Sequence, residues 1–440
     1  MNGYFFISSF PIAFTKMTAE DFTQHDIIKN LIKQLKKKGV HRKIFSDVLD
    51  DEGHQYVDLV QEGGGVLGIA LIGYVHVLEQ MGIRFLGYAG TSVGAINTIY
   101  MASIADRTKP KTDKMINLIA NKNFIDFIDG DENAREFAIA ISENDGEIHW
   151  SKLIWRGVKA FSKLWEDWGL NPGTHFYYWF TEALGKEGVY TSKHLEDAVK
   201  NFPKSLRIRQ GVNHTIEGLK ATISIIATDI TTETKVVFPQ MRSLYWENSH
   251  LINPTNFVRA SMSIPFFFTP FKVKDIPRGK KARANWKNTV DYRGDIPKEV
   301  FFVDGGIISN FPADVFHKPH VPRLPSFGVK LGTERNHPNN ITNPFVFTRA
   351  IAESMRQIAD YNFILRNRDY RQLITWIDIG NHNWIDFTLS DEDKLDLFIR
   401  GAKAAAHFLR TFDWQKYKDT RAAQNPYNIL PPKDDFTIPS

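Results

Sequence analysis

The segment Gly90-Thr91-Ser92-Val93-Gly94 has the residue types and spacing of a serine nucleophile placed at a sharp turn between a strand and a helix. In a Gly-x-Ser-x-Gly pentapeptide the two glycines leave room where side chains would collide, and the serine is exposed at the corner. The pentapeptide alone says little, because a chain of this length contains it by chance in roughly one case in ten. Its surroundings strengthen the interpretation, since an apolar run at 83–88 precedes it and a helical pattern at 95–100 follows it. We therefore expect Ser92 to be a nucleophile rather than a structural turn residue.

A glycine-rich loop, Gly63-Gly64-Gly65-Val66-Leu67-Gly68, directly follows a predicted strand at 56–60. The backbone N–H groups of such a loop can converge on an anion, which is typical of a phosphate-binding loop or of an oxyanion hole. A Walker loop would end in Gly-Lys-Ser/Thr, and this one does not. The dinucleotide fingerprint Gly-x-Gly-x-x-Gly does match, but the acidic residue expected about 20 residues later is absent. We favour an oxyanion hole, with Gly63, Gly64, Gly65 and Gly68 as the candidate residues.

The elements around these two motifs predict that they lie close together. The order along the chain is strand, glycine loop, helix at 69–81, second strand at 83–88 and serine turn. A right-handed crossover makes the two strands parallel, so their carboxyl ends share one edge of the sheet. The glycine loop and Ser92 should therefore meet at that edge.

The serine needs a base, and the sequence offers two kinds of candidate. In the order of α/β-hydrolases an acid and then a histidine follow the serine. The histidines beyond residue 300 stand in no evident strand-end motif; they are His317, His320, His337, His382 and His407. By contrast, Asp304 ends the apolar strand 300–303 and precedes Gly305-Gly306, which predicts a place on the same sheet edge as Ser92. A carboxylate is a weak base at its free pKa of about 4 and must be partly desolvated to serve, and position alone fits a turn-capping aspartate equally well.

The rest of the chain alternates predicted strands and helices. Further strands are expected at 221–228, 326–331 and 373–379, and helices at 344–366 and 391–411. This alternation favours an α/β fold with three layers, in which helices cover both faces of a mostly parallel central sheet.

The chain divides into three predicted parts. Residues 1–50 form an N-terminal extension with an amphipathic Lys-rich helix, 51–420 form the catalytic domain, and 421–440 form a loosely ordered tail. Within the domain, residues from about 105 to 220 are expected to be a helical insertion or lid. The N-terminal helix, at 24–39, is expected to pack on the domain through an apolar face made of Ile27, Ile28, Leu31, Ile32 and Leu35, with membrane attachment as the alternative.

The composition narrows the functional classes. The 440 residues carry 55 Lys and Arg against 50 Asp and Glu, an excess too small to indicate nucleic-acid binding without a clustered patch. The absence of cysteine excludes disulfides and thiolate catalysis. Neither a metal-ligand spacing nor a cofactor motif is evident, so we expect neither group. We expect a cytoplasmic protein with contact to a membrane surface as a further possibility; the apolar residues 1–16 lack the features of a secretion signal, although they do not exclude export.

At these motifs the chain resembles the patatin-like phospholipase family. That family carries a glycine-rich oxyanion loop, a Gly-x-Ser-x-Gly nucleophile and an Asp-Gly-Gly/Ala motif, and it uses a Ser-Asp dyad without a catalytic histidine. The three motifs occur here in that order, as Gly63 to Gly68, Gly90 to Gly94 and Asp304-Gly305-Gly306. Weaker similarities are found in Ala227-Thr228-Asp229, in the segment from Arg259 to Pro265, and in Asn310-Phe311-Pro312.

The resemblance implies a patatin-like fold and a lipid acyl hydrolase of the phospholipase A type. Ser92 would attack a carboxylic ester of a phospholipid or other lipid and form an acyl-enzyme, with Asp304 as its base. One departure is Leu67, because the family usually carries Arg or Lys before the last glycine of the loop. There are two alternatives. One is a soluble esterase or thioesterase, and the other is a catalytically weak regulatory or binding protein of the same fold.

Two aromatic segments bear on the substrate. Phe266-Phe267-Phe268 and Phe271 precede a basic stretch that contains one acid, Asp275. Its basic residues are Lys272, Lys274, Arg278, Lys280, Lys281, Arg283 and Lys287. This combination suits an anionic membrane surface, but a core strand followed by a solvated loop gives the same pattern. The Trp-rich segment 150–180 predicts either a lid over the acyl pocket or a helical layer of the core.

Overall fold

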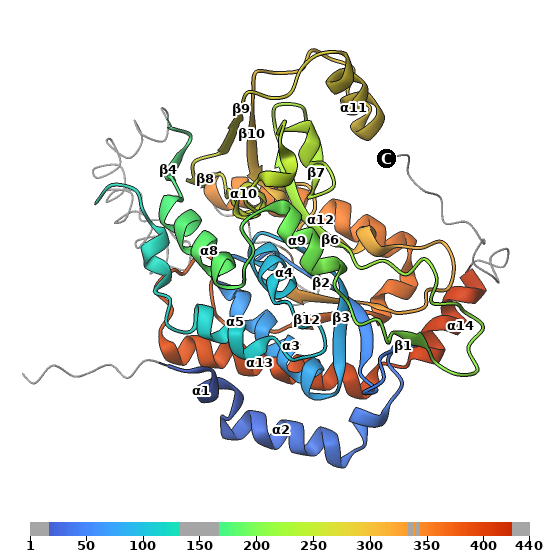
Figure 1. Cartoon of the computed structure of the whole chain (residues 1–440). Coiled ribbons are helices and arrows are strands. Elements are labelled where there is room, and N and C mark those ends of the chain that lie inside the picture. The colour runs from blue at the N-terminus through green and yellow to red at the C-terminus, as the bar shows by residue number, and fades with distance from the viewer. Residues whose placement is uncertain (1–16, 133–166, 333–337, 339–340, 342–343, 425–440) are drawn as a thin grey trace, which may run out of the picture.

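The computed structural model describes residues 17–132, 167–332, 338, 341 and 344–424 (Figure 1). A mixed sheet with the strand order β12-β11-β2-β3-β6-β10-β9 forms its centre. The parallel strands are β2 (Gln55–Gln61), β3 (Ile83–Thr91), β6 (Ile223–Asp229), β11 (Ser326–Leu331) and β12 (Ile374–Ile377). The antiparallel strands are β1 (Val48–Leu49), β5 (Arg207–Ile208), β7 (Thr234–Phe238), β9 (Phe271–Lys274) and β10 (Glu299–Asp304).

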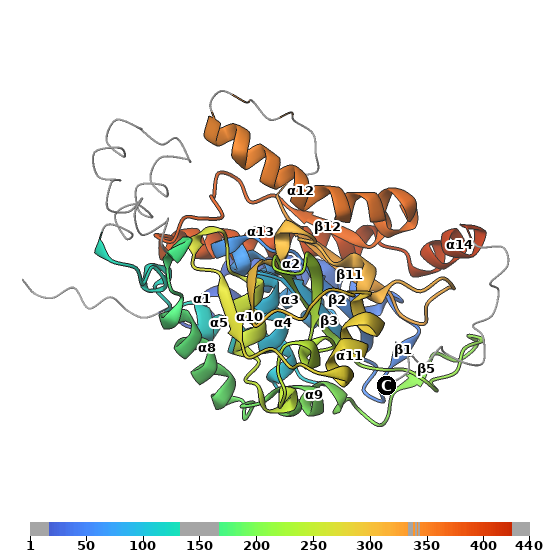
Figure 2. The same ribbon diagram turned by 90° about the horizontal axis from the view of Figure 1, so that it is seen from above.

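Helices flank this sheet. They are α1 (Ala19–Thr23), α2 (Asp26–Lys37), α3 (Gly68–Gln80), α4 (Val93–Ser103), α5 (Thr112–Ile119), α8 (Thr174–Lys186), α9 (Ser192–Lys200), α10 (Thr255–Ser261), α11 (Lys280–Val290), α12 (Pro344–Arg366), α13 (Asp391–Thr411) and α14 (Trp414–Gln424). A separate pair of short strands, β4 (Gly169–Asn171) and β8 (Phe266–Phe268), lies beside α8 and α10. Seen from above, α12 lies on the opposite side of the molecule from α8 and α9 (Figure 2).

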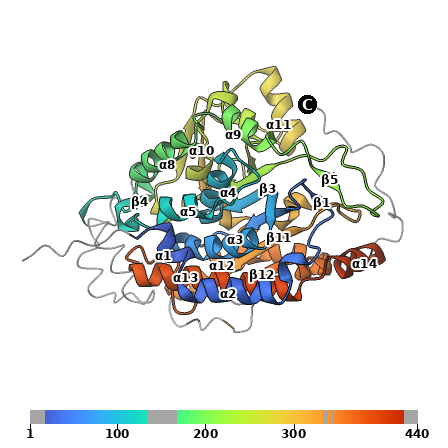
Figure 3. The same cartoon turned by 60° about the horizontal axis from the view of Figure 1, so that its bottom comes forward.

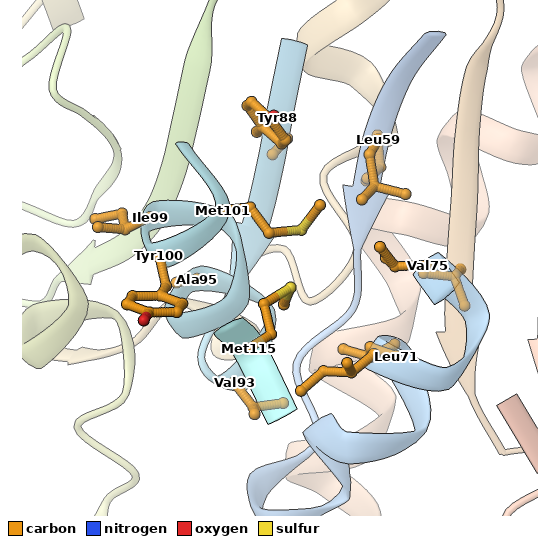
Figure 4. Packing of buried hydrophobic residues seen from close by; sticks show 14 of the residues in the cluster. Leu59, Leu71, Val75, Tyr88, Val93, Ala95, Ile99, Tyr100, Met101 and Met115 are labelled. Carbon is orange, nitrogen blue, oxygen red and sulfur yellow. The ribbon is translucent and has the colours of Figure 1, made fainter. Parts of the chain in front are cut away.

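The core lies between the central strands and α3, α4 and α13. Central parallel strands are covered on both faces and therefore consist of nearly continuous apolar residues, as β2 and β3 do. Leu59 of β2, Val75 of α3 and Met101 of α4 meet in this core (Figure 4). Helix α13 packs closely on α3 because Gly401 faces the backbone of Ala70, where a Cβ atom would come within 1.8 Å of the carbonyl oxygen.

Most of the predicted elements are confirmed. Helices α12 and α13 begin and end at the predicted residues, and the predicted parallel strands recur with small shifts of their ends. The prediction that Asp304 ends a strand on the same sheet edge as Ser92 requires a parallel strand, and the structure differs. Strand β10 runs antiparallel to β6, because it returns from β9 as the second strand of an antiparallel pair. The central strands are thus parallel, and the sheet as a whole is mixed.

The parts outside the predicted catalytic domain pack into the same core. Helix α2 lies along α13 (Figure 3) and buries Ile28 and Leu35, whereas Ile27, expected on the apolar face, is 43% exposed. At the other end, α14 continues beyond residue 420, and its buried Arg421 pairs with Asp369 at 3.1 Å. Both ends of the described chain thus pack against the central domain.

The predicted helical insertion contains short strands as well as helices. Strands β4 and β5 lie within residues 105–220 alongside α5, α8 and α9. Three of the tryptophans that suggested a lid, Trp150, Trp155 and Trp165, lie outside the described residues. Within the described part of the chain, no helix is both long enough and apolar enough to cross a bilayer.

Candidate active site

Ser92 occupies a strained turn between β3 and α4. Its backbone has φ 53° and ψ −121°, a conformation that residues with a side chain adopt rarely and at a cost of about 1–3 kcal/mol. The Ser92 N–H donates a hydrogen bond to the Ser261 hydroxyl at 2.9 Å, which holds the turn. Because α4 begins at Val93, Ser92 also lies at the positive end of the helix dipole.

Gly90 and Gly94 allow this turn to pack against the end of β2. A Cβ atom at Gly90 would lie 2.3 Å from the Gly94 carbonyl oxygen, and one at Gly94 would lie 2.3 Å from the Gln61 carbonyl oxygen. Any side chain at either position would push the three backbone segments apart. The glycines of the pentapeptide thus bring Ser92 to the strand from which the glycine loop emerges.

The glycine loop lies directly beside Ser92. A Cβ atom at Gly63 would be 3.0 Å from the Ser92 Cβ, and one at Gly68 would be 2.2 Å from a methyl group of Val93. The Gly63 N–H donates to the Asn310 carbonyl at 3.1 Å. Gly63 is therefore engaged in holding the loop, which corrects the expectation that it offers a free donor. Among the described residues, the N–H groups of Gly64 and Gly65 donate to no backbone carbonyl.

Asp304 lies at the end of β10, at the same level of the sheet as Ser92. The register pairs Asp304 with Ala227 of β6, and pairs Thr91, the residue before Ser92, with Ile226. The two residues thus flank the end of β6 from opposite sides. Because β10 runs antiparallel to β6, the shared edge formed by the carboxyl ends of the parallel strands does not explain the position of Asp304. Asp304 is instead placed at the level of Ser92 by the pairing of β10 with β6.

Hydrogen bonds fix Asp304 on both sides of its backbone and on its carboxylate. Its N–H donates to the Ser263 carbonyl at 2.8 Å, and its carbonyl accepts from the Thr228 hydroxyl at 3.1 Å. Its Oδ1 accepts the Gly306 N–H at 2.7 Å. A Cβ atom at the intervening Gly305 would lie 2.1 Å from the Ile226 carbonyl oxygen, so this position must be small. The Asp-Gly-Gly motif therefore orients the carboxylate and seats it against β6.

Arg259 and Asp229 belong to the segments with weaker similarity to the family, and both form hydrogen bonds near Asp304. The guanidinium of Arg259 donates to the Ser263 hydroxyl and to the carbonyls of Pro172 and Thr269. Burial lowers the pKa of Arg259 to about 10. Asp229 accepts the Thr231 N–H at 2.8 Å in the turn after β6, and burial raises its pKa. Both residues hold backbone segments next to Asp304.

An apolar cavity of about 60 Å³ adjoins Ser92 and the glycine loop. Its lining includes Gly65 and Ser92, together with the aromatic residues Phe124, Phe176, Trp179, Phe268 and Phe387. A larger hollow of about 1050 Å³, between β12 and α13, contains none of the predicted site residues. Of the predicted site residues, Gly65, Gly68 and Ser92 line this small apolar cavity.

A buried charge network lies behind the glycine loop, and sequence reasoning missed it. Glu62, the residue before the loop, pairs with Lys330 of β11 at 2.6 Å, and their side chains are 3% and 8% exposed. A lysine within the apolar strand 326–331 was the available signal.

Asp360 of α12 extends this network to the segment that follows Asp304. It accepts hydrogen bonds from the Ser309 hydroxyl at 2.8 Å and from the Phe311 N–H at 2.6 Å. Burial raises the pKa of Asp360 to about 6, and the charge of Lys330 partly offsets that rise. Asp360 stands in a helix without any motif, so no local pattern indicated it.

The fold and the site together define an α/β protein with a serine in a strained strand-to-helix turn, a glycine loop beside it and an apolar cavity in front. The sequence profile of the family described as patatin-like phospholipase matches residues 59–317, more than half of the chain, and this span contains all three motifs. The protein belongs to the patatin-like phospholipase family, whose members are lipid hydrolases that act on lipid esters.

The proteins similar to this chain include one bacterial relative and one solved structure. The protein YqhO of Bacillus subtilis, described as uncharacterized, is 29% identical over 363 residues, which cover 82% of this chain and all of that protein. The crystal structure of VipD from Legionella pneumophila aligns with a TM-score of 0.40 and 13% identity, covering 84% of this chain and 70% of that one.

Proposed function

We propose that this protein is a lipid acyl hydrolase of the phospholipase A type, with Ser92 as the nucleophile and Asp304 as its base. Membership of the family supports the substrate class. The observation that carries the assignment of the nucleophile is the strained backbone of Ser92, held at the wall of an apolar cavity. Strain of this kind persists where the surrounding structure enforces it, and it is concentrated at functional sites.

The position of Asp304 supports its role as the base. Neighbouring strands lie about 4.8 Å apart, so backbones that flank β6 are separated by about 10 Å. Ala227, the residue of β6 that pairs with Asp304, is small enough for the two side chains to reach over it. Asp304 is 7% exposed and Ser92 is 5% exposed, so a proton can pass between them largely without bulk water.

The reaction then proceeds in two balanced steps. Ser92 Oγ attacks the ester carbonyl carbon while Asp304 takes the hydroxyl proton, and the tetrahedral intermediate expels the alcohol, which receives that proton from Asp304. Water next attacks the acyl-enzyme, Asp304 takes a proton from it, and Ser92 leaves with that proton as the fatty acid is released.

The developing oxyanion needs donors in front of Ser92. We assign this role to the N–H groups of Gly64 and Gly65, which lie in the loop beside Ser92. The N–H group of Val93 is a third candidate donor, because Val93 is the first residue of α4. The N–H groups at the start of a helix have no partner within the helix, and they carry its positive dipole end. Leu67 supplies no charge, so backbone donors are the main source of stabilisation.

A soluble esterase acting on short acyl chains is the second candidate, favoured by the size of the cavity. A volume of about 60 Å³ is far smaller than a long acyl chain requires unless the aromatic walls move. Comparing esters of increasing acyl length separates the two functions. A phospholipase hydrolyses long-chain phospholipid esters at least as well as short-chain esters, whereas the esterase loses activity as the chain lengthens.

Hydrolysis by matched variants tests the dyad. Ser92→Ala and Asp304→Asn should each lower kcat by about a thousandfold or more. Asp314→Asn, which removes an exposed carboxylate paired with Lys235 at 2.9 Å, should keep the wild-type rate. Wild-type turnover by either dyad variant would refute the proposal.

A further inference from the structure

Trp168 and Phe266 have large apolar side chains that are exposed to solvent. Trp168 is 52% exposed and Phe266 is 63% exposed. Both have positive φ, 58° and 67°, which is unusual for a bulky residue. They lie at adjoining ends of β4 and β8, because Gly169, next to Trp168, pairs with Phe266. The chain thus keeps two aromatic side chains exposed in a backbone conformation that costs free energy, which indicates a contact outside the chain.

Strand β8 connects this exposed pair to the apolar cavity. Phe266 is exposed, Phe267 stacks on Phe387 with ring centroids 4.7 Å apart, and Phe268 lines the cavity beside Ser92. Phe387 lines that cavity as well. Three consecutive aromatic residues therefore lead from the solvent to the wall of the cavity.

Cationic side chains adjoin the aromatic pair. The Nζ atom of Lys272 lies 4.7 Å from the ring centroid of Phe301, and that ring contacts Trp168 at 5.0 Å. Lys274 lies two residues further along β9 and is also exposed. The acid facing Lys272 is Glu299 at 3.9 Å, with both side chains 42% exposed, so solvent screens this pair.

The positive charge continues beyond β9. Residues 272–281 contain five cations and a single acid, Asp275. Figure 1 shows β8, β9 and α11 at the same upper end of the molecule. Tyr178, 68% exposed, lines a hollow of about 310 Å³ together with Lys272. Tyr and Trp side chains are enriched where a protein meets the headgroup region of a bilayer, and lysines there attract anionic lipids.

We propose that this face, defined by Trp168, Tyr178, Phe266, Lys272 and Lys274, docks on an anionic lipid bilayer. The aromatic side chains enter the interfacial layer and the lysines lie among the headgroup phosphates, so lipid enters along β8 toward Ser92. This inference rests on the proposed function, because the bilayer supplies the ester. An excess of cations beside exposed aromatic residues, continuous with an apolar cavity, favours a lipid surface over a protein partner.

Vesicle binding tests the docking face without turnover. In a Ser92→Ala background, sedimentation with vesicles of phosphatidylcholine plus phosphatidylglycerol should exceed that with phosphatidylcholine alone. The pair Trp168→Asn and Phe266→Asn should reduce binding to the anionic vesicles by about tenfold or more. Asparagine tolerates positive φ, so the backbone is preserved. The pair Lys272→Gln and Lys274→Gln should reduce it similarly and weaken its dependence on salt. A matched pair on exposed lysines of α2, Lys33→Gln and Lys36→Gln, should bind as the parent does.

Activity measurements separate this inference from the proposed function. With Ser92 intact, the face variants should hydrolyse a soluble short-chain ester at the wild-type rate and vesicle lipid more slowly, in proportion to binding. If no ester is hydrolysed but binding still depends on the face, the hydrolase fails and the docking face stands. Unchanged binding by both pairs would overturn the docking face. So would a dimer that the aromatic variants convert to a monomer without loss of vesicle binding, because a second copy would then be the occupant.

Discussion

Asn310 and Gly63 hold each other through two hydrogen bonds. The Gly63 N–H donates to the Asn310 carbonyl at 3.1 Å, and the Asn310 side-chain amide donates to the Gly63 carbonyl at 3.1 Å. Both residues are buried. This reciprocal pair joins the start of the glycine loop to the segment that follows Asp304, so the proposed oxyanion donors and the proposed base are fixed relative to each other.

Asn310→Ala should therefore impair both stability and turnover. It leaves the buried Gly63 carbonyl without its side-chain donor, a loss of about 1–3 kcal/mol in the free energy of unfolding. A displaced glycine loop should lower kcat on a soluble ester by about tenfold or more with little change in KM. Steady-state kinetics and urea unfolding measure the two effects. Asn121→Ala, at an exposed amide that bonds the Met17 carbonyl, is the control; a wild-type kcat in Asn310→Ala would show that the pair does not position the loop.

Asp360→Asn should change how stability depends on pH. Burial raises the pKa of Asp360 to about 6, above the value of about 3.9 expected in the unfolded chain. The folded chain therefore binds this proton more tightly than the unfolded chain does. The resulting contribution of Asp360 to the free energy of unfolding is full below about pH 4 and is lost as the pH rises through about 6. A shift of about two pKa units corresponds to about 2–3 kcal/mol. The free energy of unfolding of Asp360→Asn, measured by urea unfolding, should rise by about 2–3 kcal/mol relative to that of the wild type between about pH 4 and pH 7. A difference between the two proteins that stays constant over this pH range would contradict this.

Leu67→Arg, which restores the residue usual in the family, should destabilise this protein. Leu67 is 1% exposed, and an arginine there would have to bury a cation. We expect a loss of several kcal/mol, seen as a lower melting temperature. Leu67→Met conserves volume and should cost less than about 1.5 kcal/mol. An arginine variant as stable as wild type and faster in hydrolysis would mean that the loop accommodates the cation.

The sequence predicted those features that depend on neighbouring residues. The apolar runs of β2 and β3, the glycines around Ser92 and the ends of α12 and α13 follow from local periodicity and turn chemistry. The direction of β10 could not be predicted in this way, because it depends on the pairing of β10 with β9 and β6.

The missed site features depend on long-range contacts. The engagement of the Gly63 N–H and the hydrogen bonds of Asp360 join residues that lie far apart in the chain. A side chain whose partners come from distant segments gives no local signal, so the motifs and weaker similarities included Asp304 and Asn310 but gave no indication of Asp360.

Reaction with a fluorophosphonate probe, followed by mass spectrometry, tests the central claim most directly, because the probe forms a covalent bond only with an activated nucleophile. We expect one adduct on Ser92 of the wild-type protein, none in Ser92→Ala, and a rate of labelling lowered by about a thousandfold in Asp304→Asn. An adduct on another residue, or labelling of Asp304→Asn at the wild-type rate, would contradict the proposed Ser92–Asp304 dyad.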